Sequence, residues 1–277
     1  MTEPFKCKCP FKHHVDVNKT APPATGSETY PDVNAFNDVV KKVPITEEDQ
    51  YAIDLFKEML RIPSITGDGP NGPSAQCIQF YASVCDMYGI PWKTLEFTPG
   101  YPIFLATVPG KDDSKPSILL NSHFDVVPLV QERWTYPAFD AIELENGDIV
   151  ARGAQDMKCV CIHHLVGLIR VLRDAARTQL GIEVALDTKD DPNKKLLGTS
   201  KLLSRTIHLA SMPDEELGGP KGMVKWSTSS EFDSLNVGFA LDEGLASEKR
   251  EVISFYGERT VWWLEIHAKG MGVILLT

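Results

Sequence analysis

Three apolar segments, each typical of a buried strand, run directly into acidic or histidine residues. SILLN (117–121) leads into SHFD, IHLASM (207–212) into PDEE, and VGFAL (237–241) into DEG. These endings supply the side chains of His123, Asp125, Asp214, Glu215, Glu216, Asp242 and Glu243. Ligands of open α/β sheets bind beyond the carboxyl ends of the strands. The sequence therefore predicts a fold that brings all three endings to one edge of a sheet.

Helix and strand patterns alternate along most of the chain. Apolar spacing predicts helices after Thr46, at 74–88 and after Asp156, and a short helix at 220–227. Further strand patterns cover 93–97, 102–108, 251–256 and 261–268. This alternation is typical of an α/β domain.

Composition divides the chain into two parts. Residues 1–45 are polar and rich in proline, which predicts a flexible N-terminal extension, and residues 46–277 form the folded domain. Thr46 and Asp49 have the spacing of a capping box at the start of that domain. Between 178 and 203 lies a long connection that contains the polar run TKDDPNKK. Its length predicts a lid, a disordered loop or an insertion.

The net charge of the chain disfavours some classes of binding partner. Its 277 residues include 38 acidic and 28 basic side chains, a formal net charge of −10. This excess of acid argues against nucleic acid or an anionic membrane surface as the main partner. No apolar run reaches the roughly 18 residues that a membrane span needs, and the first residues lack the apolar core of a signal peptide. We expect a soluble cytoplasmic protein with reduced thiols.

The residues at the strand ends suit a metal centre. One histidine with several carboxylates and no thiolate is a donor set for zinc, manganese or cobalt. The carboxylates outnumber the needs of one tetrahedral zinc, which favours two ions bridged by a carboxylate. Asp125 follows His123 by two residues in an extended segment and can orient its imidazole. Glu215 and Glu216 diverge, so one can bind metal while the other is a general base.

Each group also has a simpler explanation when it is taken alone. A histidine at a strand end can be structural, an Asp-Glu-Glu run can be the charge at a helix N-terminus, and Asp156 can be an N-cap. The coincidence of four groups at successive strand and helix ends favours the metal centre. A serine or cysteine hydrolase is disfavoured because the sequence contains no G-x-S-x-G motif.

Two further groups of cysteine and histidine residues are better interpreted without a metal. The first is an N-terminal tract, which we interpret as an incidental cluster rather than a metal site. The second lies on the predicted long helix, where an apolar stripe favours ordinary packing. Their members are Cys7, Cys9, His13 and His14, and Cys159, Cys161, His163 and His164.

Five segments around the strand-end residues resemble the aminoacylase-1 family of N-acyl-L-amino-acid amidohydrolases. They are LLNSHFDVVP (119–128), ARGAQDMKCV (151–160), RTIH (205–208), PDEELGGPKGM (213–223) and GFALDEG (238–244). The family belongs to the dizinc peptidase clan of acetylornithine deacetylase, succinyl-diaminopimelate desuccinylase and carboxypeptidase G. The resemblance implies a three-layer, zinc-peptidase-like α/β catalytic domain, with a central mixed sheet flanked by helices.

The resemblance also implies roles for single residues. His123 matches a ligand of one zinc ion, and Asp156 matches the carboxylate that bridges both ions. Glu216 matches a ligand of the other zinc, and Glu243 a further carboxylate ligand of the pair. The implied cofactor is Zn²⁺, two ions in a complete site.

Two more residues match the family's catalytic carboxylates. Asp125 matches the acid that supports the histidine ligand. Glu215 matches the general base that deprotonates water and then protonates the leaving amine. The implied reaction is the hydrolysis of a small-molecule N-acyl-L-amino acid to a carboxylate and a free amino acid.

Two departures from the family pattern modify these expectations. Residues 177–203 exceed the family's connection, which implies an insertion. After VWWLEIHAKG (261–270) the chain runs into MGVILLT, where the family continues with a Gly-His motif. We therefore expect an incomplete catalytic domain without the lid or dimerisation domain, without the family's remaining site histidines and without its homodimer interface. The sequence predicts negligible hydrolysis of N-acetyl-methionine by this chain alone, and the alternative function is a truncated, catalytically impaired metal-binding homologue.

Overall fold

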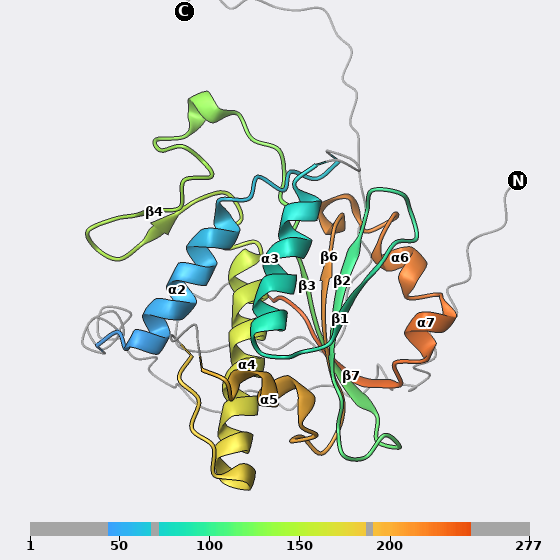
Figure 1. The fold of residues 1–277 in the computed structure, drawn as a ribbon. Coiled ribbons are helices and arrows are strands. Elements are labelled where there is room, and N and C mark those ends of the chain that lie inside the picture. Colours follow the sequence, from blue (N-terminus) through green and yellow to red (C-terminus); the bar gives the residue numbers. More distant parts are fainter. Residues whose placement is uncertain (1–43, 68–71, 187–190, 245–277) are drawn as a thin grey trace, which may run out of the picture. The chain divides into compact units, whose positions relative to one another are not determined.

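The computed structural model describes residues 44–67, 72–186 and 191–244, which all belong to one compact unit (Figure 1). Almost all of the predicted N-terminal extension, with its Cys/His tract, lies outside the described residues, as do the strands predicted at 251–256 and 261–268. Within the described ranges, no helix is long and apolar enough to cross a membrane.

A mixed five-stranded sheet forms the centre of this unit. Its strands are β1 (Trp92–Leu95), β2 (Ile103–Val108), β3 (Ser117–His123), β6 (Ile207–Met212) and β7 (Val237–Leu241), in the order β1-β2-β6-β3-β7. β3 pairs in parallel with both β6 and β7, whereas β2 is antiparallel to β1 and to β6. The carboxyl ends of β3, β6 and β7 therefore meet at one edge of the sheet, as the three apolar segments predicted.

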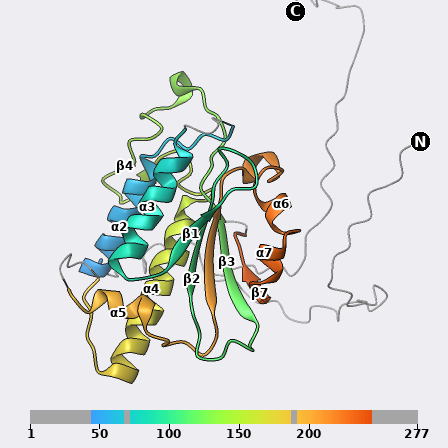
Figure 2. The same cartoon turned by 45° about the vertical axis from the view of Figure 1, so that its right-hand side comes forward.

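Helices cover both faces of the sheet. Figure 1 shows α2 (Glu47–Leu60), α3 (Ser74–Met87) and α4 (Lys158–Leu180) on one side of the strands, and α6 (Met223–Trp226) and α7 (Ser230–Asp233) on the other. Figure 2 shows the same three layers after a turn of 45°. The predicted three-layer α/β fold with a central mixed sheet is confirmed.

Apolar side chains pack on both faces of the sheet, and β2 contributes to both clusters because its side chains alternate between the faces. Phe104 and Ala106 pack into the large cluster under α2, α3 and α4. Ile103 and Leu105 point the other way and pack with Trp226 of α6. Successive residues of a strand face opposite sides, so a strand buried on both faces is apolar throughout.

Local signals position the helices at the ends that the sequence indicated. The Thr46 hydroxyl accepts from the Asp49 N–H at 3.1 Å, and the Asp49 carboxylate accepts from the Thr46 N–H at 3.1 Å. This is the predicted capping box of α2.

A short ribbon of β4 (Ile142–Glu143) and β5 (Ile149–Val150) precedes the loop that enters α4. A single turn, η1 (Gln131–Arg133), lies between β3 and this ribbon.

The connection at 178–203 differs from its prediction. α4 continues to Leu180, and α5 (Lys194–Thr199) packs against α3, where the Gly198 N–H donates to the Tyr88 carbonyl at 2.9 Å. Leu186 and Leu197 are fully buried in the main core. The expectation of a lid or a disordered loop is therefore wrong for the described part of this stretch. Its apolar residues pack in the core, which the polar run between them did not indicate. Its status as an insertion stays a prediction.

Gly198 provides a test of this packing. A Cβ at Gly198 would lie 2.3 Å from the Gly89 carbonyl oxygen, so α5 must move away from the end of α3. We expect Gly198→Ala to lower the free energy of unfolding by about 1–3 kcal/mol, the usual effect of overpacking. Urea unfolding measures this change. Gly167→Ala on α4 is the control, since a Cβ there meets nothing within 4 Å and should stabilise the helix by about 0.5–1 kcal/mol.

Candidate metal centre

The strand-end residues come together at the carboxyl edge of β3, β6 and β7. His123 is the last residue of β3 and is 1% exposed. Glu215 and Glu216 lie in η2 (Glu215–Leu217), just after β6, and Glu243 lies just after β7. Asp156 lies two residues before the first residue of α4.

The two ring nitrogens of His123 have different partners in this cluster. Its Nδ1 lies 2.9 Å from the main-chain oxygen of Asp125, which can only accept a hydrogen bond. The Nδ1 therefore carries a proton, an assignment made from this contact, and the Nε2 is the nitrogen that a metal ion can bind in place of a proton. The Nε2 lies 3.1 Å from Asp156 Oδ1 and 3.5 Å from both Glu215 Oε2 and Glu243 Oε1.

Two overlapping groups of ligand atoms form around this nitrogen. One joins His123, Asp156 and Glu216, and the other joins His123, Glu215 and Glu243. Within each group the ligand atoms all lie within 4.8 Å of one another. One imidazole nitrogen among carboxylate oxygens is a donor set that suits zinc and related divalent ions. The geometry thus fits the metal that the resemblance implies.

The electrostatics of the cluster favour a bound cation. Burial, followed by the charge of Asp156, raises the pKa of Glu216 to about 7. Burial also raises the pKa of Glu215. Burial alone would lower the pKa of His123, but its contacts with Asp125 and Glu243 outweigh this effect and raise the pKa to about 12. Without metal, an imidazolium proton offsets part of the carboxylate charge, and a metal ion on Nε2 would take the place of a proton there.

Asp125 has a second task that the sequence did not indicate. Its carboxylate is buried and accepts from two main-chain N–H groups, that of Glu215 at 3.0 Å and that of Glu216 at 3.2 Å. Its Oδ1 also lies 3.3 Å from the Nδ1 of His123. Asp125 thus connects the end of β3 to the turn that carries both glutamates.

The other two strand-end acids shape loops. Asp214 is fully buried and accepts from the Lys221 N–H at 2.7 Å. Asp242 accepts from the Asn121 side-chain amide at 2.7 Å and from the Glu243 N–H at 2.9 Å. Neither acid belongs to the two metal-ligating groups among the described residues. Asn121 is a site-supporting residue that the sequence reasoning missed, although its position two residues before His123 on β3 was a usable signal.

The cysteines and histidines of α4 do not join these groups in the described part of the chain. Leu165, Leu168 and Leu172 of the same helix are buried in the main core. The interpretation of this helix as a packing element is confirmed for these leucines.

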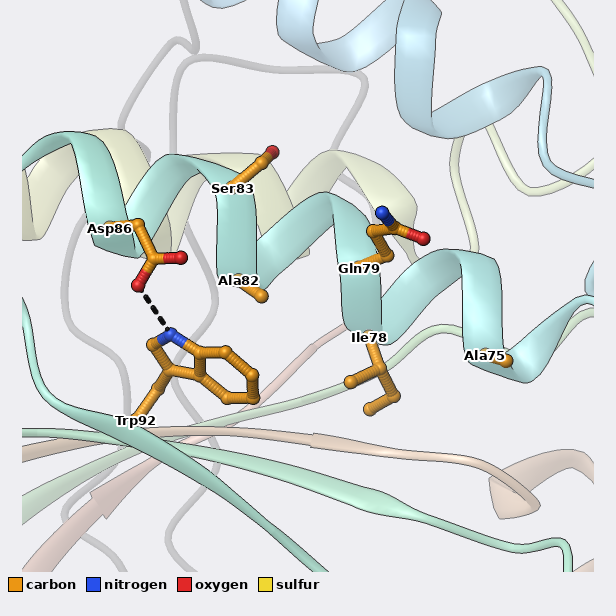
Figure 3. Close-up of a pocket in the computed structure, with 7 residues that line it drawn as sticks. All are labelled: Ala75, Ile78, Gln79, Ala82, Ser83, Asp86 and Trp92. Carbon is orange, nitrogen blue, oxygen red and sulfur yellow. Dashed lines mark hydrogen bonds between the residues drawn. The ribbon is translucent and has the colours of Figure 1, made fainter.

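A surface pocket of about 400 Å³ lies away from the cluster residues, between α3 and β1. Figure 3 shows the ring of Trp92 near Ala82 and Asp86 of α3, with Ile78 and Ala75 farther along the helix. The Trp92 Nε1 donates to Asp86 at 2.8 Å across this pocket (Figure 3). None of the metal-ligating residues lines it.

Asp125→Asn tests the link between strand and turn. The amide would place a donor against one of the two N–H groups that the carboxylate now accepts, so the turn with Glu215 and Glu216 should shift. We expect zinc affinity to fall about 10- to 100-fold, as for other residues that orient metal ligands. Competition with a chelating dye measures the affinity, with the exposed Asp148→Asn as control. An unchanged affinity would contradict this role of Asp125.

Comparison with known proteins finds related sequences. The family model of the M20/M25/M40 peptidases matches residues 119–189. Human aminoacylase-1 is 35% identical over 224 residues, which are 81% of this chain and 48% of the human protein. Aminoacylase-1 of Dictyostelium discoideum is 37% identical over 225 residues, with the same two shares. The chain is aminoacylase-1-like over most of its length and matches the M20 peptidase family over residues 119–189.

The resemblance carried by the five sequence segments is thereby confirmed, and the M20 family is one of hydrolases. The chain spans about half the length of the curated aminoacylases that it matches. Among solved structures, human carnosine dipeptidase 1 is similar with a TM-score of 0.49 and 16% identity, over 76% of this chain and 40% of that one.

Proposed function

We propose that this M20 chain carries the dizinc centre of an amidohydrolase that acts on N-acyl-L-amino acids. The observation that supports this most is the contact set of His123. Its Nδ1 bonds to the Asp125 carbonyl, while its Nε2 faces Asp156, Glu215 and Glu243. The similarity to aminoacylases supports the substrate class.

Four residues would hold the metal pair. His123 and Glu243 would bind one zinc, Glu216 the other, and Asp156 both. Zinc bound there would supply Lewis acidity, which acidifies water and polarises an amide carbonyl. The side chain of Asp156 is 65% exposed, which leaves an open approach for a small substrate.

Glu215 would move the proton. Its Oε2 lies 3.5 Å from His123 Nε2, so it stands beside the metal position rather than in a separate part of the site. Glu215 would take a proton from the attacking water and deliver it to the amine nitrogen as the C–N bond breaks. Asp125 would hold the turn of Glu215 in place during this transfer.

A second candidate is a metal-binding homologue without turnover. One observation favours it: among residues 44–67, 72–186 and 191–244, His123 is the single imidazole in the cluster. A complete catalytic zinc site commonly has more than one nitrogen ligand.

One experiment separates the two candidates. The purified chain is loaded with zinc, its metal content is measured, and the release of free amine from N-acetyl-L-methionine is followed. Two zinc ions with zinc-dependent hydrolysis support the amidohydrolase. Zinc without hydrolysis supports the second candidate, and a chain that binds no zinc contradicts both.

A further inference from the structure

Lys158 is a buried cation at the edge of the metal centre. It is the first residue of α4, follows Asp156 by two positions, and is fully buried. Its Nζ donates to the Met59 carbonyl at 3.1 Å and to the Ile62 carbonyl at 2.6 Å. Lysines are rarely buried, and burying an ammonium that has no ion pair, as here among the described residues, costs stability. Such a group calls for a reason beyond packing.

The two acceptors lie at the end of α2. Met59 is in its last turn and Ile62 follows it. The Met59 carbonyl also accepts from the Ile62 N–H at 3.2 Å, and the Ile62 carbonyl from the Ser64 N–H at 2.9 Å, so the lysine is a second donor to each. A cation is favourable at this end of a helix. Lys158 therefore ties the start of α4 to the end of α2, two segments that are 96 and 99 residues apart in sequence.

The loop that carries Asp156 wraps around the Lys158 side chain. The Lys158 N–H donates to the Gly153 carbonyl at 3.1 Å. A Cβ at Gly153 would lie 3.4 Å from Lys158 Cδ and 2.7 Å from Val126 Cγ1, and Gly153 has a φ of +82°. The loop thus lies close against the lysine stem on one side and against Val126 on the other.

The segment beyond α2 also holds the residues after β3, which include Asp125. The Val126 N–H donates to the Ser64 carbonyl, and the Thr66 N–H donates to the Val126 carbonyl, both at 2.9 Å. The Ser64 hydroxyl donates to the Phe124 carbonyl at 2.5 Å. Residues 62–66 are therefore a common support: they bind residues 124–126 directly, and Ile62 also binds the ammonium of Lys158.

From these contacts we propose that Lys158 is a positioning residue for Asp156, holding its carboxylate at the correct distance from His123. The lysine fixes the Asp156 loop to the same support that fixes the end of β3. The proposal rests on the proposed metal centre, since Asp156 is there the carboxylate that joins both ions. It assigns the lysine no contact with metal or substrate.

The test compares two buried lysines. Lys158→Met keeps most of the stem and removes the donors. Lys194→Met is the matched control, because Lys194 is also buried and its Nζ donates to the Leu186 carbonyl at 2.8 Å, in the packing of α5. Zinc affinity is measured by chelator competition, and thermal unfolding is measured on the metal-free proteins. The Co²⁺-loaded proteins are compared by visible absorption, which reports ligand geometry.

We expect both variants to unfold at lower temperature. Only Lys158→Met should lose zinc affinity, about 10- to 100-fold, with an altered Co²⁺ spectrum. Equal zinc affinities and Co²⁺ spectra in the two variants would overturn the proposal, because Lys158 would then be merely structural. If Lys158→Met does not fold, Lys158→Gln, which retains an amide donor, is judged by the same criteria.

A wild-type chain that binds no zinc would contradict the proposed function and leave the positioning role to a second measurement. Hydrogen exchange of the metal-free proteins then decides. Faster exchange over residues 152–158 in Lys158→Met, but not in Lys194→Met, supports the lysine as the anchor of this loop. Unchanged exchange there would overturn it.

Discussion

Replacing His123 by alanine is expected to remove zinc from this centre almost completely. The imidazole is the only nitrogen donor of the cluster in the described ranges, and its Nε2 is the atom around which both ligand groups form. Structural zinc sites with four ligands bind with roughly 10–16 kcal/mol, so one ligand contributes about 2.5–4 kcal/mol, or on the order of 10²- to 10³-fold in affinity. Chelator competition and metal analysis of the purified protein measure the loss.

His208→Ala is the matched control for this experiment. His208 is also buried in the central sheet, on β6, and its Nδ1 lies 2.9 Å from the Thr107 hydroxyl. Its loss should lower stability but leave zinc binding intact. Because the tract with Cys7 and Cys9 could bind zinc on its own, both variants are studied with these cysteines changed to serine. Equal zinc affinity in His123→Ala and His208→Ala would refute the metal centre.

The fold was predictable because its signals are local and repeated. Apolar segments that end in acids marked β3, β6 and β7, and the Thr46–Asp49 spacing marked the start of α2. The packing of α5 was not predictable in this way. It depends on a close approach between Gly198 and Gly89, which are far apart in sequence, and a polar run stands between the apolar residues that carry it.

The candidate site shows the same division. The residue types at each strand end indicated which segments meet there. Which acid of a run enters the site depends on the turn: Asp214 faces inward to the Lys221 N–H, while the next two residues face His123 and Asp156. Lys158 was missed for a different reason, since sequence patterns treat a lysine as exposed and only the fold places carbonyl groups around it.

Glu215→Gln and Glu216→Gln are expected to have different effects, because the two adjacent glutamates are assigned different roles. Both lie within reach of His123, and each belongs to one of the two ligand groups. By resemblance, Glu216 is the metal ligand and Glu215 the general base. Glu216→Gln should therefore reduce the zinc content toward one ion per chain. Glu215→Gln should retain both ions and lower the hydrolysis of N-acetyl-L-methionine about 10²- to 10⁴-fold, the usual contribution of a general base.

The pair of variants is informative even where hydrolysis is slow, because zinc stoichiometry alone distinguishes the two glutamates. Each variant keeps the length and shape of the side chain and removes only its charge, so the turn held by Asp125 should be preserved in both. Loss of zinc from Glu215→Gln with retention in Glu216→Gln would exchange the two roles. That result would have a structural basis, since Glu215 Oε2 already lies 3.5 Å from the metal-binding nitrogen of His123. Loss of zinc from both would mean that the site needs every carboxylate around His123 for charge, with no residue set aside for proton transfer.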